Sequence, residues 1–208
     1  MFCNWLTEMR DGNTDNIVYS GIDAAWMHED TVEDTTKNGY RMPTSIEWEY
    51  AARYRGTDST NTVIGYVNPF YTKGNSASGA YTYHDDAADV NPKNSIVDGK
   101  DANDKVAVYN YYWNGSSWIW QNPSGAEEAA VKSLGLNSSN ALGLYDMSGN
   151  VCEWCFTRDA DSRVYRGGTW SGAADILPVG NSSKDKAWYG NDRIGLRLCR
   201  TEPVNKSV

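Results

Sequence analysis

Apolar and polar positions follow a helical spacing in only a few parts of the chain. The first of these runs from Phe2 to Met9, where apolar residues recur every three or four positions. This pattern predicts a short amphipathic helix, and the polar run Asp11-Gly12-Asn13 ends it. The helix would begin without a capping residue, which leads us to expect further chain upstream.

A second helical pattern lies in Arg41 to Arg53, with the sequence RMPTSIEWEYAAR. Thr44 or Ser45 can cap its first turn, and Glu47 then stands where a capping box places an acidic residue. The helix is expected to continue until Gly56 ends it.

Short strands are predicted wherever apolar and polar residues alternate with a period of two. The predicted segments are 17–19, 105–109, 117–120, 151–156, 163–170 and 194–200. The rest of residues 57–140 consists mostly of Gly, Asn, Asp and Ser clusters, which predicts a loop-rich insert with one or two helical turns at 127–134. We therefore expect one α+β domain over residues 1–208, with more loop than sheet.

The composition excludes several classes of partner. A net charge of −8 argues against a nucleic acid and against an anionic membrane surface. No apolar run is long enough to insert into a membrane. The 9 Trp and 14 Tyr against 3 Phe favour half-buried sites and binding surfaces, because these side chains join a large apolar body to a polar tip.

Few residues fit a common catalytic arrangement. His28 and His84 are the two histidines, so a three-histidine site cannot form in one chain. A mechanism with a single histidine remains possible, but we interpret both as solvated loop residues. Acidic clusters such as 98–104 could serve acid/base chemistry or bind calcium, but no spacing fixes either role. A solvated acidic surface is the simpler interpretation.

Cys152 and Cys155 form a Cys-x-x-Cys pair inside an alternating segment. Three positions apart on a strand, their side chains would face opposite sides. We expect buried, unreactive thiols, and the alternative is a disulfide that involves Cys3 or Cys199.

Several ordered stretches resemble the formylglycine-generating enzymes and their sulfatase-modifying relatives. They are RMPTSIEWEYAAR at 41–53, NALGLYDMSGNVCEW at 140–154, and the segments 163–170 and 194–200. The resemblance implies a variant of the C-type lectin fold, with a small twisted antiparallel sheet, two helices and many long loops. The second helix would then span Ser45 to Arg55.

The resemblance also bears on activity. Enzymatic members oxidise a substrate cysteine with two cysteines that follow the Gly-Gly motif, and alignment on Gly167-Gly168 puts those positions at Gly172 and Leu177. A thiolate is needed to bind copper and to exchange with the substrate. The alignment therefore implies a protein without this activity, and an enzyme that uses a different residue set or an inactive scaffold for an active homologue remain the alternatives.

Most residue types between Trp170 and Arg193 are those that an Asn codon yields when only its adenines change. This pattern resembles the variable proteins of diversity-generating retroelements. It implies a monomer at the cell surface, without a required cofactor, whose variable region 163–200 binds an unknown protein or other macromolecule. The alternative is an ordinary polar loop. The implied ligand-binding residues are Tyr165, Ser171, Gly172, Ala173, Asp175, Ile176, Pro178, Ser182, Ser183, Asp185, Ala187, Tyr189, Gly190 and Asp192.

A structural calcium ion is also implied by the resemblance. Its ligands would be the side chains of Asp146 and Glu153 and the carbonyls of Gly149 and Val151, all of them hard oxygen donors. In the alternative, Asp146 caps a turn and Glu153 pairs with a buried arginine.

Overall fold

A computed structural model of the chain describes residues 1–22, 30–81, 100–114, 116–120 and 137–201. His28, His84 and the helical turns expected at 127–134 lie outside these residues. In chain order the elements are α1 (Phe2–Asp11), β1 (Tyr19–Ser20), β2 (Val32–Glu33), β3 (Tyr40–Arg41), α2 (Ser45–Arg53), β4 (Tyr54–Gly56), β5 (Phe70–Tyr71), α3 (Lys100–Asn103), β6 (Ala107–Val108), β7 (Tyr111–Trp113), β8 (Trp118–Trp120), β9 (Ser148–Gly149), β10 (Cys152–Asp159), β11 (Ser162–Arg166), the 3-10 helix η3 (Ala174–Ile176), β12 (Ser183–Asp185), β13 (Ile194–Leu196) and β14 (Cys199–Arg200).

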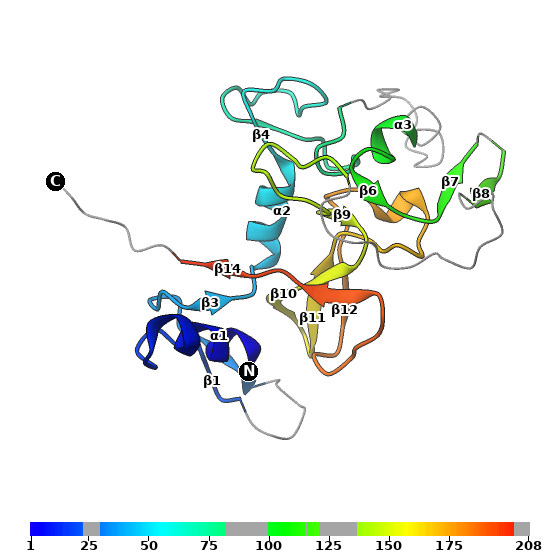
Figure 1. The fold of residues 1–208 in the computed structure, drawn as a ribbon. Helices are drawn as coiled ribbons and strands as arrows, with labels where there is room; N and C mark the ends of the chain where they lie inside the picture. Colours follow the sequence, from blue (N-terminus) through cyan, green and yellow to red (C-terminus); the bar gives the residue numbers. More distant parts are fainter. Residues whose placement is uncertain (23–29, 82–99, 115, 121–136, 202–208) are drawn as a thin grey trace.

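The largest sheet has the strand order β12-β11-β10-β13 and lies below α2 in Figure 1. Its first three strands are antiparallel, as expected, but β13 pairs with β10 in parallel. After β12 the chain crosses from one edge of the sheet to the other, so β13 enters in the same direction as β10. The expectation of a wholly antiparallel sheet is therefore wrong for this strand.

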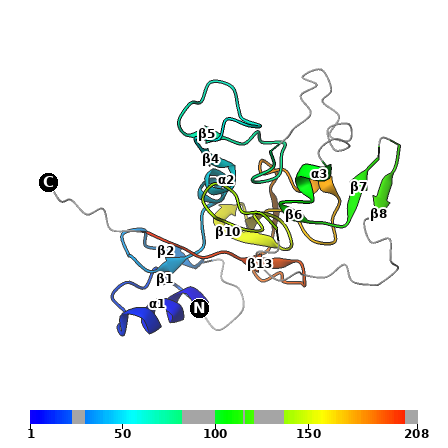
Figure 2. The same cartoon turned by 45° about the horizontal axis from the view of Figure 1, so that its top comes forward.

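Shorter two-stranded sheets surround this centre, and α1 lies at the opposite end of the molecule from the β7–β8 hairpin in both views (Figures 1 and 2). Strands appear near each segment where alternation predicted one. In the predicted segment 17–19, however, the strand β1 begins only at Tyr19, and it pairs with β2.

Helix α2 begins as the sequence predicts. The Thr44 side chain accepts a hydrogen bond from the Glu47 N–H, and the Glu47 carboxylate accepts one from the Thr44 N–H at 2.8 Å, which completes a capping box. The helix ends at Arg53, earlier than Gly56. Tyr54 is already extended because it pairs with Tyr71 of β5, so the predicted end of this helix is wrong.

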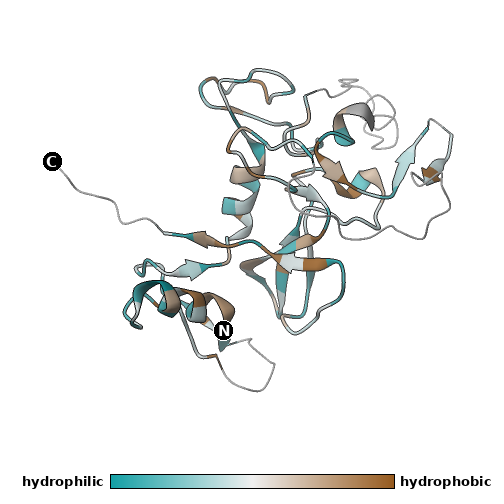
Figure 3. Cartoon of the chain, in the orientation of Figure 1, coloured by the Kyte–Doolittle hydropathy of each residue, from teal (hydrophilic) through white to brown (hydrophobic). Residues whose placement is uncertain are grey.

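Helix α1 extends to Asp11, and Gly12 closes it in the left-handed conformation with φ 68°. The helix carries both apolar and polar residues, as its colouring in Figure 3 shows. The apolar residues Phe2, Trp5 and Met9 are nevertheless exposed. The buried residues are Cys3 and Thr7. The Thr7 hydroxyl accepts the Tyr40 N–H at 2.8 Å, so a hydrogen bond to β3 decides which side of the helix faces the protein.

Three groups of buried side chains hold the fold together. One lies between α2 and the large sheet and contains Trp48, Ala52, Met147, Cys155, Val164 and Val179. A second joins the described part of residues 57–140 to η3 and contains Ala77, Ala80, Ala102, Val106, Ala107, Tyr109, Ala174 and Leu177. The third, Cys3, Val18 and Tyr19, lies beneath α1. The loop-rich region therefore shares a core with the C-terminal segment.

The ion pair between Glu47 and Arg41 gives a pH-dependent prediction. Hydrogen bonds from the Arg41 guanidinium lower the pKa of Glu47 from 4.5 to about 2. A depressed pKa stabilises the fold above the unfolded-state value, and this contribution is lost as the pH falls from 4.5 towards 2. Glu47→Gln retains a capping-box side chain but loses the charge. We expect it to lower the free energy of unfolding by about 0.5 kcal/mol at pH 7.

Urea unfolding followed by tryptophan fluorescence at pH 7, 4.5 and 2.5 measures this effect. The wild-type protein should lose more stability than Glu47→Gln as the pH falls. Equal losses in both proteins would show that the ion pair does not act on folding.

Candidate ligand-binding surface

The segment 171–192 leaves the end of β11, passes through η3 and β12, and returns to the sheet at β13 (Figure 1). Just before it, the Trp170 N–H donates to the Asn150 carbonyl at 2.7 Å. The Gly172 carbonyl then accepts two N–H groups at the start of β7, at 2.8 and 3.2 Å. Backbone hydrogen bonds therefore fix the first turn of the segment, and the Thr169 and Ser171 hydroxyls, 3.3 Å apart, add a side-chain contact.

The Gly167-Gly168 turn ahead of this segment requires glycine. Gly168 has φ 74°, and a Cβ there would lie 2.8 Å from the Ile176 carbonyl oxygen. Gly167 has φ 104°, and its Cβ would lie 3.3 Å from the Trp48 ring. Both the backbone angle and the lack of space explain the Gly-Gly pair in the motif.

Burial divides the segment into two sets of side chains. None of the fourteen residues that the sequence implies as ligand-binding is buried. The three buried residues in the same segment are Ala174, Leu177 and Val179, at 3%, 1% and 0% exposure. They enter the cores described above, and none of them belongs to the implied set.

A polar cavity of about 340 Å³ lies beside this surface. Four of the implied residues line it: Tyr165, Ile176, Ser182 and Ser183. Cys152, Asn181 and the residues 166–169 around the Gly-Gly turn complete the lining. Tyr165 and Ser183 face each other across β11 and β12. The Tyr165 hydroxyl is protonated at neutral pH, as in any tyrosine, and can donate a hydrogen bond to a ligand; burial raises its pKa further.

The structure does not gather all fourteen residues around this cavity. Ala187 lines a second, apolar cavity on the α1 side of the sheet. Gly172 and Ile176 depend on each other, because a Cβ at Gly172 would lie 2.0 Å from the Cδ1 atom of Ile176. A side chain at position 172 therefore requires the flexible end of Ile176 to move.

The implied calcium ligands lie close in sequence, but Glu153 already has other partners. One oxygen accepts hydrogen bonds from Trp48 Nε1 at 2.7 Å and Arg197 Nε at 2.8 Å, and the other pairs with Arg197 Nη2 at 2.7 Å. A guanidinium at this distance repels a divalent cation, so the arrangement fits the alternative in which Glu153 pairs with an arginine, although Arg197 is half-buried, with 26% of its side chain exposed. In the described part of the chain, no three His, Cys, Asp or Glu side chains are grouped to hold a metal ion. The calcium site stays a prediction.

The cysteines follow the expectation of free, mostly buried thiols. All four are unpaired with one another, and Cys3, Cys152 and Cys155 are buried. Cys152 lines the polar cavity, whereas Cys155 lies in the core beneath α2, so the Cys-x-x-Cys pair does not act as a unit. Burial raises the pKa of Cys152 to about 11 and that of Cys155 to about 12.

The sequence patterns assign no role to Arg163, although it begins the predicted 163–170 strand. The structure buries it at 9% exposure in the wall of the apolar cavity. No local pattern signals this, because the cavity forms only when α1 packs near the sheet.

Together, the helices, the small sheets and the long connections define an α+β protein with a C-type lectin-like fold of the formylglycine-generating type. A sequence model described as "Sulfatase-modifying factor enzyme 1-like domain" matches residues 1–202, and the chain belongs to this family. The resemblance that the motifs predicted is thereby confirmed.

Two solved structures share the fold. Treponema denticola variable protein 1 has 25% sequence identity and a TM-score of 0.53, covering 86% of this chain and 54% of that one. CarF has 21% identity and a TM-score of 0.56, covering 97% and 63%. The chaperone protein LppX of Paenibacillus barcinonensis is 29% identical over 180 residues, which are 79% of this chain and 50% of that protein. The chain thus spans about half the length of the curated relative that it matches.

Glu153→Gln tests whether this carboxylate holds an arginine or a calcium ion. The variant leaves Arg197 without its counter-charge, and we expect a loss of about 3 kcal/mol in the free energy of unfolding. If Glu153 holds only the arginine, the loss should be the same with calcium and with EDTA. The exposed Glu8→Gln is the control and should change stability by less than about 0.5 kcal/mol. A calcium-dependent loss at Glu153, measured by thermal unfolding, would support the calcium site instead.

Thiol titration tests the state of the cysteines. With a pKa of about 11, the thiolate fraction of Cys152 at pH 8 is about 100-fold lower than that of an ordinary thiol with a pKa of 9. We expect slow reaction of the native protein with a thiol reagent and four reactive thiols after unfolding without reductant. Only two thiols after unfolding would reveal a disulfide.

Proposed function

We propose that this protein is a non-catalytic ligand-binding member of its family, with a binding surface formed by Tyr165 and residues of the segment 171–192. The carrying observation is the division of that segment by burial. Every implied binding residue reaches the surface at least in part, while Ala174, Leu177 and Val179 anchor the backbone. A surface that varies must leave the core unchanged, and this division provides it.

A protein is the ligand that this surface suits best. Tyr165 and Tyr189 supply large contact areas at a small cost in conformational entropy, and serine and aspartate around them supply hydrogen bonds. Proteins similar to this chain include one titled a variable protein and one named a chaperone, which supports a protein ligand. Display at the cell surface, by a monomer, belongs to the same proposal. No helix among the described residues is long and apolar enough to cross a bilayer.

The rival proposal is that this protein is an enzyme, since the family model that matches the chain is described by the name of a sulfatase-modifying enzyme. The polar cavity would be its active site, with Cys152 in the wall. Its raised pKa makes Cys152 a poor nucleophile at neutral pH, and positions 172 and 177 carry glycine and leucine. Copper binding and oxidation of a peptide thiol would favour the enzyme.

Two matched libraries test the binding proposal. One randomises the exposed positions Asp175, Ser182 and Asp192, and the other randomises Ala174, Leu177 and Val179. Exposed substitutions usually change stability by less than about 0.5 kcal/mol each, whereas changes in a core cost several times more. We expect most members of the first library and few of the second to resist proteolysis.

The first library should also yield binders when it is selected on an immobilised test protein such as lysozyme. Equal unfolding in both libraries, or no binders from the folded one, would contradict a variable binding surface. Sequencing the DNA around the gene gives a separate test of natural variation. A near-copy of codons 163–200 that differs only at adenines, beside a reverse transcriptase gene, is the expected result.

A further inference from the structure

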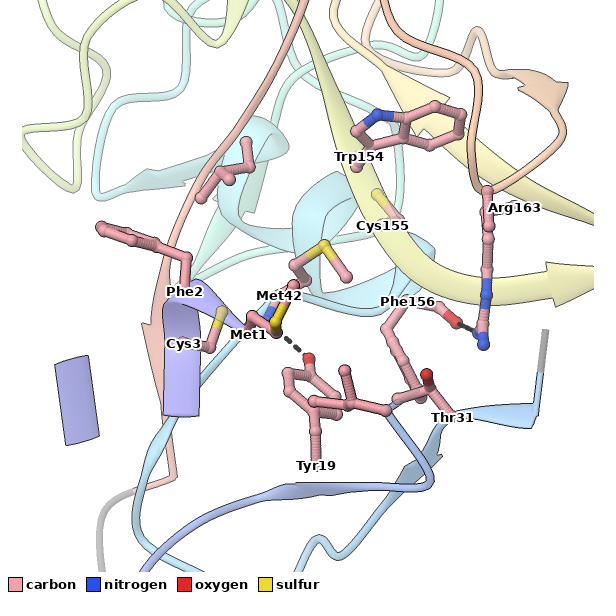
Figure 4. Close-up of a pocket in the computed structure, with 13 residues that line it drawn as sticks. Met1, Phe2, Cys3, Tyr19, Thr31, Met42, Trp154, Cys155, Phe156 and Arg163 are labelled. Atoms are coloured by element: carbon pink, nitrogen blue, oxygen red, sulfur yellow. Dashed lines mark hydrogen bonds between the residues drawn. The ribbon is translucent and has the colours of Figure 1, made fainter. Parts of the chain in front are cut away.

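An apolar cavity of about 240 Å³ lies between α1 and the large sheet, away from the polar cavity described above. In Figure 4, Phe2 and Met42 lie on one side, Trp154 above, and Tyr19 and Phe156 below. Phe2, at 50% exposure, stands at a rim that is open to solvent. The cavity is therefore accessible to a small molecule.

One charged side chain, Arg163, forms the wall opposite Phe2 in this view (Figure 4). Its guanidinium donates a hydrogen bond to the Phe156 carbonyl and lies 4.1 Å from the centroid of the Phe156 ring. Burial lowers the pKa of Arg163, which reflects the loss of water around the cation.

The other buried arginines show what Arg163 lacks. Among the described residues, four arginines are buried, and three have a carboxylate partner. Arg41 pairs with Glu47 at 2.7 Å, Arg55 with Asp58 at 2.5 Å, and Arg166 with Glu49 at 2.8 Å. Arg163 forms no ion pair with any described residue. The charge of Glu33 acts on this cation, but from beyond ion-pair distance, so a carboxylate in direct contact with the buried guanidinium would still be favourable.

We propose that this cavity binds an aliphatic monocarboxylate. The planar guanidinium of Arg163 matches a carboxylate, and charge-assisted hydrogen bonds of this kind are stronger than neutral ones. Met42, Trp154 and Tyr19 offer apolar contacts to the hydrocarbon chain. A cavity of about 240 Å³ has room for a hydrocarbon chain of medium length, and octanoate is the test ligand chosen for it. The site borders the proposed macromolecular surface, since Ala187 belongs to both, but it takes a different class of ligand.

Isothermal titration calorimetry of the protein with octanoate tests this proposal. Acetate has the charge without the chain, and 1-octanol has the chain without the charge. We expect octanoate to bind at least about tenfold more tightly than either, because a charge-assisted hydrogen bond contributes more than one factor of ten in affinity. No octanoate binding at millimolar concentration, or equal binding of 1-octanol, would overturn the proposal.

Arg163→Met and Arg158→Met form a matched pair of variants. Arg158 is the cross-strand neighbour of Arg163, but it is exposed and does not line the cavity. We expect Arg163→Met to weaken octanoate binding by about tenfold or more and Arg158→Met to leave it within about twofold. Equal binding by wild type and Arg163→Met would overturn the assignment.

Ala187→Phe provides a second test that keeps the arginine. Ala187 lines the same cavity, and the larger ring would occupy the space of the hydrocarbon chain. We expect octanoate binding to be lost while near-ultraviolet circular dichroism shows a folded protein. If Arg163→Met does not fold, this variant decides the question, and unchanged octanoate binding would overturn the proposal.

Discussion

The carboxylate of Glu153 joins parts of the chain that are far apart in sequence. Trp48 of α2 and Arg197, which follows β13, both donate to it, and Arg197 also reaches the Tyr145 carbonyl at 2.9 Å. Burying a charge pair contributes little net stability, but its partners must meet in one geometry. This interaction therefore fixes how α2 and the crossing strand β13 lie against the sheet. The rest of the C-terminal half depends on that placement.

The segment 171–192 is held between this pair and the Gly167-Gly168 turn. Its interior points of attachment are Ala174, Leu177 and Val179, which fill space in two separate cores. A loop fixed at both ends and along its inner side has few backbone conformations, so its outward side chains need not hold it in place. The position of the segment thus depends on residues that a changing surface would leave untouched.

Local patterns predicted what is determined locally. The capping box at Thr44 starts α2, and alternation found β10, β11 and β13 of the large sheet, because both signals depend on neighbouring residues. Alternation did not find β12, whose residues Ser183–Asp185 are polar and pair with β11. The parallel direction of β13, the early end of α2 and the exposed face of α1 depend on partners distant in sequence, and no local pattern contains them. The same holds for Arg163, whose burial without an ion pair to any described residue follows from the packing of α1. The binding residues were implied by residue types and a family resemblance, and the structure adds only their exposure.

The two cavities share an aromatic wall. Contacts of this kind determine which of the implied binding positions tolerate substitution. Trp154 lines the apolar cavity and Tyr165 the polar one, and their rings meet edge to face with centroids 5.3 Å apart. Such a pair stabilises by about 0.5–1.5 kcal/mol beyond the area it buries, so a replacement for Tyr165 must still cover the Trp154 ring. Gly172 is restricted in another way, by contact with Ile176. Ser182 is exposed and is subject to neither restriction. Variation that preserves the fold is therefore expected mainly at exposed positions such as this one.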